Sequence, residues 1–415
     1  MRIFKFGGAS VKDGASVKNV SQIIRSYKED KMLIVVSAMG KMTNAFENLI
    51  ESYWLTDILE EKKLTVIYSF HHKILTELFP LNHIAFTDFE KNFELLRSAV
   101  FKGKGDSYPA YYDQIVSFGE LFSTRLIHYY LEEDGLFNTW LDARKLIITN
   151  SNFQNADVDW DKTTERVHEF VGEHGIYLTQ GFVAGDVLGN TTTLGREGSD
   201  YSAAILAYVC DAKRMTIWKD VDGFYSADPN QFDQVSKFEK LSFHEAIELA
   251  YYGATVVHPK TIQPLRQKGI PLWVKSFVEP EKMGTIISSD EDIVPEVPAF
   301  IVKKNQFLIS ISTRDFSFIV EKNLSKIFNI CAEIGVKVNL MQNTAVSCSL
   351  VLSHDTVKIP QLMEVLRQDY DVKYNEGLDL YTVRHYTEEI IQEIKGNHRM
   401  VIEERNQRTV QLLLK

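Results

Sequence analysis

The segment TTTLGREGSD, residues 191–200, brings together groups that bind small charged molecules. It holds three threonines, the guanidinium of Arg196, two carboxylates, a serine and two glycines. A guanidinium fits a carboxylate or a phosphate with two parallel hydrogen bonds, and glycine leaves the backbone open to a ligand. The segment is too polar for a packed strand and too mixed in charge for an ordinary linker. It is therefore a candidate for binding a ligand that needs hydroxyl donors, one cation and bare backbone together.

A second candidate is KFGGAS, which contains Lys5, Gly7, Gly8 and Ser10 at the end of a strand-like run. Two adjacent glycines after a strand let backbone N–H groups approach an anion without obstruction by side chains. Lys5 supplies a point charge that suits terminal phosphates. The same residues also fit a tight turn into a helix with a solvated lysine, because glycine pairs are common in turns. Taken alone, they leave both interpretations open.

Two further segments could contribute polar groups to the same place. SAMGKMTN, with Ser37 and Thr43, follows a second buried run, and ligands of open α/β sheets bind beyond the carboxyl ends of strands. Thr43 or Asn44 would equally cap the next helix, and this alternative is favoured for the loop by itself. Glu120 follows Gly119 inside an amphipathic helix, where its carboxylate could hold an ammonium group. A glutamate on a solvated helix face is the common alternative.

The segment WKDVDGFYSADP places Asp220, Asp222 and Asp228 after another buried run. Acidic residues with glycine and proline form good turns whatever their function. Near a nucleotide they would also bind ribose hydroxyls or waters on Mg²⁺. The glycines of residues 103–105 lack the third glycine of a dinucleotide fingerprint, which argues against a dehydrogenase.

The elements that must position these residues alternate between strand and helix over the first 290 residues, which predicts an α/β domain with a mainly parallel sheet sandwiched by helices. RIFKF, MLIVV, IYLTQ and MTIWK are expected to be strands, each followed by a glycine-containing loop. A long helical stretch is predicted from about Asn44 to Asp134. SFHEAIELAYYG carries its own helix caps, Ser242 with Glu245 at the start and Gly253 at the end.

The composition changes around SSDEDIVPEVPA to acidic residues and prolines, which predicts a linker at residues 291–302. The runs beyond it follow the order βαββαβ, the ferredoxin-like arrangement, over residues 303–375. A second strand, helix, strand and strand follow over residues 376–415 without a last helix. The C-terminal part is therefore expected to hold two repeats, the second of them shortened.

The composition of the 415 residues is that of a soluble globular protein, with 45% hydrophobic and 25% charged residues. A net charge of -10 argues against nucleic acid or an anionic membrane as a partner, because both require clustered cations. The three cysteines are widely spaced and form no CxxC pair, which indicates core residues in a reducing compartment. There is no apolar run long enough to span a membrane and no signal peptide, so a cytoplasmic location is expected.

Taken together, these segments resemble one family, the aspartokinases, which have the amino-acid kinase fold and C-terminal ACT domains. The resemblance extends over essentially the whole chain, and the matching segments follow the family's order: KFGGAS, SAMGKMTN, FGE at 118–120, TTTLGREGSDYSAA, DVDGFYSADP and LSFHEAIELAYYGATVVHPKTIQP. Kinases of glutamate, acetylglutamate, carbamate or UMP share the fold, but they do not combine these motifs with a tandem ACT tail.

The resemblance implies ATP-dependent phosphorylation of the side-chain carboxylate of L-aspartate, the first step of lysine, threonine and methionine biosynthesis. By resemblance, Arg196 and Ser199 hold a substrate carboxylate, Glu120 takes the ammonium group, and Ser37 and Thr43 complete the substrate pocket. The reacting carboxylate is already ionised at neutral pH, so no general base is required.

The catalytic problem is repulsion between that carboxylate and the γ-phosphate of ATP. Lys5, the backbone amides of Gly7 and Gly8, and Mg²⁺ are the expected remedy, because phosphoryl transfer depends on positioning and charge stabilisation. Asp200 is expected to orient Lys5 or a metal-bound water rather than to act as a base. No site made only of metal-binding side chains is predicted.

Nucleotide contacts carry over by resemblance to Lys5, Gly8, Ser10, Lys219, Asp220, Tyr225, Asn230, Thr255 and Val256. Several positions depart from the family's pattern: Glu197 replaces a usual glycine, Lys219 a frequent threonine, Asn230 a frequent arginine and Thr255 a frequent lysine. These departures weaken the assignment of individual ATP contacts. Only Glu197 and the missing cation at Asn230 support a second function, a weakly active homologue that serves as an amino-acid sensor or as a regulatory partner.

The ACT-like region is expected to form a homodimer through residues beyond about Lys303, because such units leave sheet edges that pair between chains. In VNLMQNTAVS, which resembles the family's effector-binding stretch, Asn339 replaces an aspartate and Ala345 a glutamate. The loss of two carboxylates that would hold a cationic amino acid argues against feedback inhibition by lysine.

Overall fold

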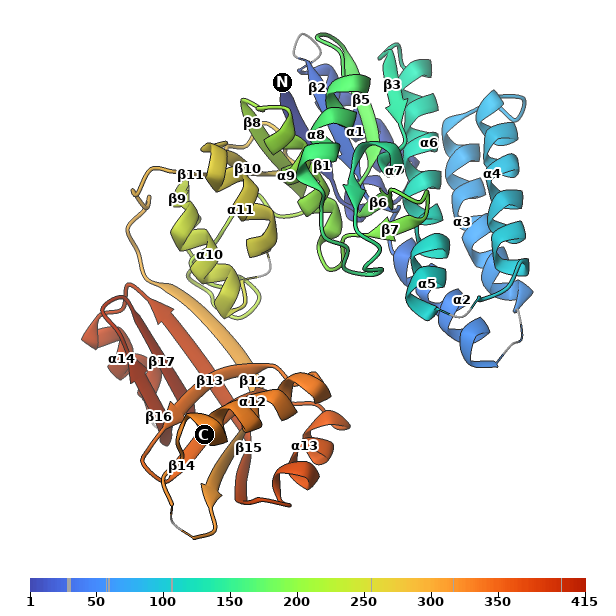
Figure 1. Cartoon of the computed structure of the whole chain (residues 1–415). Helices are drawn as coiled ribbons and strands as arrows, with labels where there is room; N and C mark the ends of the chain where they lie inside the picture. The colour runs from blue at the N-terminus through green and yellow to red at the C-terminus, as the bar shows by residue number, and fades with distance from the viewer. Residues whose placement is uncertain are drawn as a thin grey trace. The chain divides into compact units, whose positions relative to one another are not determined.

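The computed structural model describes residues 1–27, 31–56, 58, 60–105, 107–254, 256–315, 317–396 and 398–415 (Figure 1). The chain forms two compact units. The first contains residues 1–224, 237–247 and 256–295, and the second contains residues 225–236, 248–255 and 296–415.

The first unit is built on an eight-stranded sheet with the order β3-β5-β2-β1-β8-β10-β11-β9. The strands from β3 to β10 in this order are parallel, whereas β11 runs antiparallel to β10. Their bounds are β1 Arg2–Phe6, β2 Met32–Val36, β3 Asn138–Leu141, β5 Ile176–Gln180, β8 Arg214–Lys219, β9 Lys240–Ser242, β10 Leu272–Ser276 and β11 Thr285–Ser288. The mainly parallel sheet predicted from the sequence is confirmed.

Alternation along β1 decides which side chains reach the site. Phe4 and Phe6 point to one face, where they share a core with residues of α1 (Gly14–Arg25) and α6 (Phe118–Glu133). Lys5 points to the opposite face, which is covered by α9 (Gly198–Val209). The face that carries Phe4 and Phe6 therefore packs in the core and stabilises the strand. On the opposite face, Lys5 is directed toward α9.

The long helical stretch predicted between Asn44 and Asp134 is divided into five helices (Figure 1). They are α2 Met42–Thr56, α3 Glu61–Leu78, α4 Ile84–Phe101, α5 Tyr108–Val116 and α6. Gly103 and Gly105, both with positive φ, lie between α4 and α5. Ser117 separates α5 from α6, so the predicted stretch is also interrupted there. Periodicity alone did not reveal these breaks.

The remaining elements of the first unit support the loops around the sheet. A three-stranded sheet has the order β4-β6-β7, with β4 Ile148–Thr149, β6 Val183–Asp186 and β7 Thr191–Thr193. The short helices are η1 Gly8–Val11 and α7 Ala143–Leu146, followed by α8 Trp160–Phe170 and α11 Pro259–Lys268. In α10 (Phe243–Tyr252) Ser242 accepts the backbone N–H of Glu245 at 3.0 Å, so the predicted N-terminal cap is present.

The second unit contains a six-stranded antiparallel sheet with the order β13-β14-β12-β15-β17-β16. Its strands are β12 Ala299–Thr313, β13 Val338–Asn343, β14 Ser347–Ser353, β15 Tyr370–Arg384, β16 Met400–Arg405 and β17 Thr409–Leu414, and its helices are α12 Glu321–Ile334, α13 Lys358–Leu366 and α14 Glu388–Lys395. The order of the first four strands is that of a ferredoxin-like unit, so the predicted fold class is confirmed.

The two repeats are less separate than the predicted ranges imply. β12 begins at Ala299, inside the predicted linker, and its first residues pair with the end of β15, which supplies a fourth strand to the second repeat. β15 runs continuously across the predicted boundary between residues 375 and 376. Asn305 and Gly377 have positive φ, and the register shifts next to each of them. Residues typical of turns therefore produce irregularities within two long strands instead of ending them.

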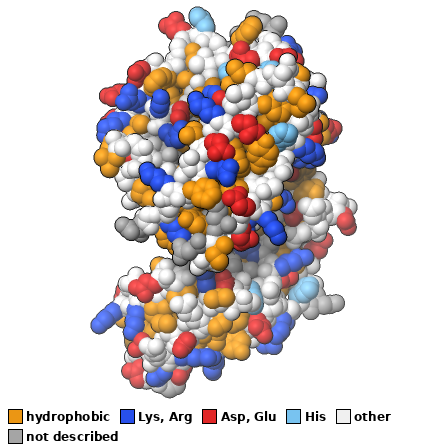
Figure 2. All heavy atoms as spheres, turned by 90° about the vertical axis from the view of Figure 1, so that its right-hand side faces the viewer, with side chains coloured by type: hydrophobic (Ala, Val, Ile, Leu, Met, Phe, Trp, Pro, Cys, Tyr) orange, Lys and Arg blue, Asp and Glu red, His pale blue; other side chains and the backbone are white. Residues whose placement is uncertain are grey.

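The surface shows no strong segregation of charge on the face drawn in Figure 2, where acidic and basic side chains are interspersed with hydrophobic ones. Within the part of the chain that the structure describes, no helix is both long enough and apolar enough to cross a bilayer.

Candidate ligand-binding and catalytic site

A cavity of about 670 Å³ opens at the carboxyl ends of β1 and β2, entirely within the first unit. Seven residues singled out in the sequence line it: Lys5, Ser37, Thr43, Glu120, Arg196, Ser199 and Asp200. They come from β1, the loop after β2, α2, α6, the loop before α9 and the start of α9. Segments almost 200 residues apart in sequence thus form one site, at the sheet edge where parallel strands present their loops.

Lys5 and Asp200 form the most buried charged pair of this cavity. Lys5 Nζ lies 2.6 Å from Asp200 Oδ1, and Lys219 Nζ lies 3.7 Å from Oδ2. Burial alone would raise the pKa of Asp200, but the two ammonium groups outweigh it and hold that pKa below its ordinary value. Asp200 is therefore ionised and a poor base, and its geometry is that of a group that orients the two lysines.

Of the two glycines after β1, Gly8 is required by close approaches of backbone. A Cβ at Gly8 would lie 2.5 Å from the carbonyl oxygen of Gly40 and 2.8 Å from that of Ala38. A Cβ at Gly7 would lie 3.4 Å from Lys5 Nζ. Gly8 thus lets the loop after β1 pack directly on the loop after β2, and Gly7 leaves space beside the ammonium group of Lys5.

Glu120 is a buried carboxylate that is only half satisfied within the protein. Its Oε1 accepts the backbone N–H of Ala38 at 3.2 Å, whereas its Oε2 is buried and accepts no hydrogen bond. Burial raises the pKa of Glu120 to about 8, although Ala38 and Lys5 oppose the shift. A buried acceptor without a partner is costly, so this geometry favours a ligand that brings a cationic donor.

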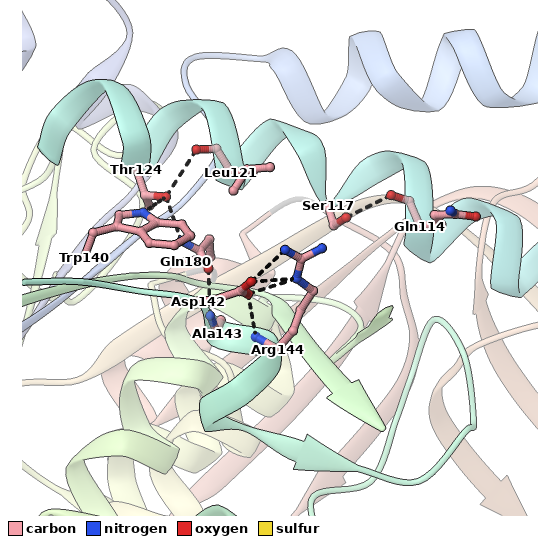
Figure 3. A network of polar contacts seen from close by, with 9 residues as sticks. All are labelled: Gln114, Ser117, Leu121, Thr124, Trp140, Asp142, Ala143, Arg144 and Gln180. Carbon is pink, nitrogen blue, oxygen red and sulfur yellow. Dashed lines mark hydrogen bonds and ion pairs between the residues drawn. The ribbon is translucent and has the colours of Figure 1, made fainter. Parts of the chain in front are cut away.

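The helix that carries Glu120 is anchored by a buried hydrogen-bond hub at Thr124 (Figure 3). The Thr124 hydroxyl accepts Trp140 Nε1–H at 3.1 Å and Gln180 Nε2–H at 2.8 Å, and it donates to the carbonyl of Glu120 at 2.9 Å. Gln180 Oε1 in turn accepts the backbone N–H of Ala143 at 2.7 Å. The ends of β3 and β5 thereby fix the first turn of α6.

Arg196 and its neighbours occupy the loop between β7 and α9. Arg196 lines the cavity, and among the described residues it forms no hydrogen bond or ion pair, so its fork is available to a ligand. Ser199 lies beside it in the first turn of α9. Glu197 has φ 55° and ψ 25°, in the left-handed region that favours glycine. This backbone conformation explains why glycine suits the position and why glutamate there is strained.

The cavity also contains residues that sequence reasoning missed: Glu47, Tyr108, Tyr112, Gln154 and Phe182. Tyr108 and Tyr112 lie one turn apart on α5, and this spacing was the available signal. Tyr112 donates its hydroxyl to Glu47 Oε1 at 2.8 Å, so both side chains are held in the wall. Gln154 and Phe182 have positive φ, which no feature of the sequence indicated.

The residues predicted to contact a nucleotide are more dispersed. Lys219 and Asp220 lie at the end of β8, and Val256 precedes α11, all in the first unit. Ser10 is buried and points its hydroxyl to the carbonyl of Trp218 rather than into the cavity. Tyr225 and Asn230 belong to the second unit, and Thr255 lies outside the described residues. Among the described members of this group, only Lys5 lines the cavity.

A protein site for Mg²⁺ requires several oxygen ligands. Among the described residues there is no group of three side chains arranged to hold a metal ion. Asp200, the buried acid nearest to Lys5, already has an ammonium group near each oxygen. These described residues do not fit a metal site made by side chains alone.

The site combines two cations, the unpaired Arg196 and the Asp200-bound Lys5, with a buried acid that needs a cationic donor, Glu120. Such a set can hold a zwitterion with an additional carboxylate. It can also bring that carboxylate next to a lysine that would stabilise a transferring phosphoryl group.

Comparisons with known proteins show what the chain as a whole is similar to. Residues 1–276 match the model of the amino acid kinase family. The chain is 32% identical to lysine-sensitive aspartokinase 3 of Escherichia coli, over 91% of this chain and 85% of that protein. It is also 32% identical to chloroplastic aspartokinase 1 of Arabidopsis thaliana, over 89% of this chain and 66% of that protein, so it spans just under two thirds of that relative's length.

Two crystal structures of E. coli aspartokinase III are similar to the whole chain. The complex with aspartate and ADP, in the R-state, superposes with a TM-score of 0.82 at 28% identity and is covered to 96%. The complex with lysine and aspartate, in the T-state, superposes with a TM-score of 0.84 at 30% identity and is covered to 95%.

Proposed function

Since the chain belongs to the amino acid kinase family and, within it, to the aspartokinases, we propose that it transfers the γ-phosphoryl group of ATP to the side-chain carboxylate of L-aspartate. The observation that carries this proposal is the single cavity in which Arg196, Glu120 and Lys5 meet. The E. coli relative of known structure binds aspartate and ADP, which supports an amino-acid and a nucleotide substrate here.

The proposed binding mode follows from charge. Arg196, with Ser199 and Thr43 nearby, receives the α-carboxylate, and Glu120 Oε2 accepts the ammonium group, which gives that buried oxygen its missing partner. Ser37 also lines this cavity. The side-chain carboxylate then faces Lys5, and it is ionised at neutral pH without help from a base.

In the proposed reaction an oxygen of that carboxylate forms a bond to the γ-phosphorus while the bond from phosphorus to the ADP oxygen breaks. The products are 4-phospho-L-aspartate and ADP. Lys5 neutralises charge on the transferring oxygens, and Asp200, which also pairs with Lys219, holds Lys5 at the end of β1. Mg²⁺ bound to the phosphates supplies further charge neutralisation. Lys219, Asp220, Tyr225, Asn230 and Val256 are the proposed nucleotide contacts, on the strength of the resemblance.

A coupled assay of ADP formation tests the proposal. The wild-type chain with Mg-ATP should release ADP only when L-aspartate is present, and hydroxylamine should trap the acyl phosphate as the hydroxamate. D-aspartate and L-glutamate are the matched control substrates. If ADP release did not depend on L-aspartate, the chain would instead be a weakly active homologue that serves as a sensor or regulatory partner.

Assembly is also a proposal. We expect a homodimer formed through the second unit, whose six-stranded sheet leaves β13 and β16 as edge strands. Sedimentation of the full chain over a range of concentrations measures this assembly.

A further inference from the structure

A buried carboxylate behind the cavity wall, Asp113 on α5, has no role in the proposed chemistry. It is fully buried and accepts three hydrogen bonds. Its Oδ2 accepts the backbone N–H groups of Gln154 at 2.9 Å and Thr193 at 2.8 Å, and its Oδ1 accepts the Thr193 hydroxyl at 2.7 Å. One side chain thus joins a helix to two loops that are 39 residues apart in sequence.

Both of these loops form the wall of the cavity. Gln154 lines it directly, and Thr193 is the last residue of β7, separated from Arg196 only by Leu194 and Gly195. The two loops also touch each other, because the backbone N–H of Ala156 donates to the carbonyl of Thr193 at 2.9 Å. A contact that holds Thr193 in place therefore also holds the start of the segment that carries the guanidinium of Arg196.

Other features confirm that this junction is tightly constrained. A Cβ at Gly195 would lie 2.9 Å from Asn155 Oδ1 and 3.0 Å from the carbonyl oxygen of Gln154. From the opposite side, Lys260 Nζ on α11 donates to Asn155 Oδ1 and to the carbonyl of Leu194, both at 3.2 Å. The two wall loops are thus held by a carboxylate on one side and an ammonium group on the other.

We propose that Asp113 is a positioning residue for the amino-acid substrate: it holds the Gln154 loop and the Thr193–Arg196 segment in register, so that Arg196 meets the substrate carboxylate. This inference rests on the proposed function. Asp113 does not touch substrate and acts only through the two loops. Asp113 should affect the binding of aspartate rather than the binding of ATP, because its hydrogen-bond partners do not include Lys5 or Lys219.

The test compares Asp113→Ala with Asp113→Asn. Alanine leaves the two backbone N–H groups without an acceptor, so the loops shift. A displacement of about 1 Å in a positioning group costs up to about 100-fold, and we expect a rise of at least about tenfold in the KM for aspartate. The KM for Mg-ATP should change less than about twofold. Asparagine can accept both N–H groups with its carbonyl and donate its amide to the Thr193 hydroxyl, so Asp113→Asn should restore the KM to within about threefold.

Asp186 offers a matched control. It is also a buried carboxylate with four hydrogen bonds, from Ser151, Leu188 and Asn190, but it shapes the turn between β6 and β7 and does not line the cavity. Asp186→Ala should lower the melting temperature while the KM for aspartate stays within about threefold. The proposal is overturned if Asp113→Ala behaves in the same way, or if it raises the KM for aspartate and for Mg-ATP together.

Two further measurements keep the test decisive. If Asp113→Ala does not fold, Thr193→Val removes one of the three hydrogen bonds, and a KM for aspartate equal to that of the wild type would overturn the proposal. Hydrogen exchange of the Gln154 and Thr193 amides needs no substrate, and these amides should lose protection in Asp113→Ala but not in Asp113→Asn. Failure of the proposed function would show in the wild type, as absence of aspartate-dependent ADP release, whereas failure of this inference leaves the wild type active.

Discussion

The half-satisfied carboxylate of Glu120 predicts that aspartate binding depends on pH. Its pKa is raised to about 8 by burial, so at neutral pH the free protein carries this side chain mostly protonated. A protonated Glu120 cannot pair with an ammonium group. Binding therefore requires loss of the proton, and the apparent affinity for aspartate should rise with pH up to about 8.

The size of the effect follows from the ionised fraction. With a pKa of about 8, that fraction is about 3% at pH 6.5, about 9% at pH 7 and about 24% at pH 7.5. The KM for aspartate should therefore fall by about eightfold between pH 6.5 and 7.5. Because the bound ammonium group keeps Glu120 ionised, each aspartate should release about 0.9 proton at pH 7.

Calorimetry in buffers of different ionisation enthalpy measures the released protons directly, and initial rates give the KM. Glu120→Gln is the matched variant, because it keeps the shape but cannot ionise. It should bind aspartate weakly with no pH dependence. The pH range of these measurements lies above the pKa of Asp113, which burial raises to about 6. The side chain of Asp113 is therefore largely ionised over the whole range. A wild-type KM that is flat between pH 6.5 and 7.5 with no proton release would refute the assignment, as would the same slope in Glu120→Gln.

Three further predictions concern other residues of the chain. Lys5→Ala should lower kcat by about 100-fold or more with a smaller change in the KM for aspartate, because its charge matters most during transfer, and an unchanged kcat would remove Lys5 from the mechanism. The Glu197→Gly variant should have a melting temperature roughly 2–4 °C above that of Glu197→Ala, because a residue with a side chain at φ 55° costs about 1 kcal/mol of stability. The kcat of Glu197→Gly should stay within a few-fold of the wild-type value. A large loss of kcat would instead make Glu197 part of the catalytic apparatus. Lysine should inhibit weakly or not at all, because Asn339 already accepts the Lys303 ammonium group at 2.9 Å and carries no charge; potent inhibition well below millimolar concentration in steady-state rates would contradict this.

The sequence by itself determined the parts of the site that depend on residue type and on local pattern. The strand RIFKF forms as expected, and alternation along it sends Lys5 away from the apolar face of Phe4 and Phe6. The family motifs identified the seven predicted residues that line the cavity. These features could be predicted from the sequence because a short strand, a glycine pair and a charged side chain act on the conformation of residues close to them in the chain.

The tertiary structure alone decided which distant segments meet. Tyr112 and Gln154 enter the wall because α5 packs beside β7, and Asp113 reaches both loops only in that arrangement. The continuity of β15 across Gly377 likewise depends on its pairing with β12, a strand far away in sequence. Local propensity cannot report such contacts, because the hydrogen bonds and burial that stabilise them exist only after the chain has folded.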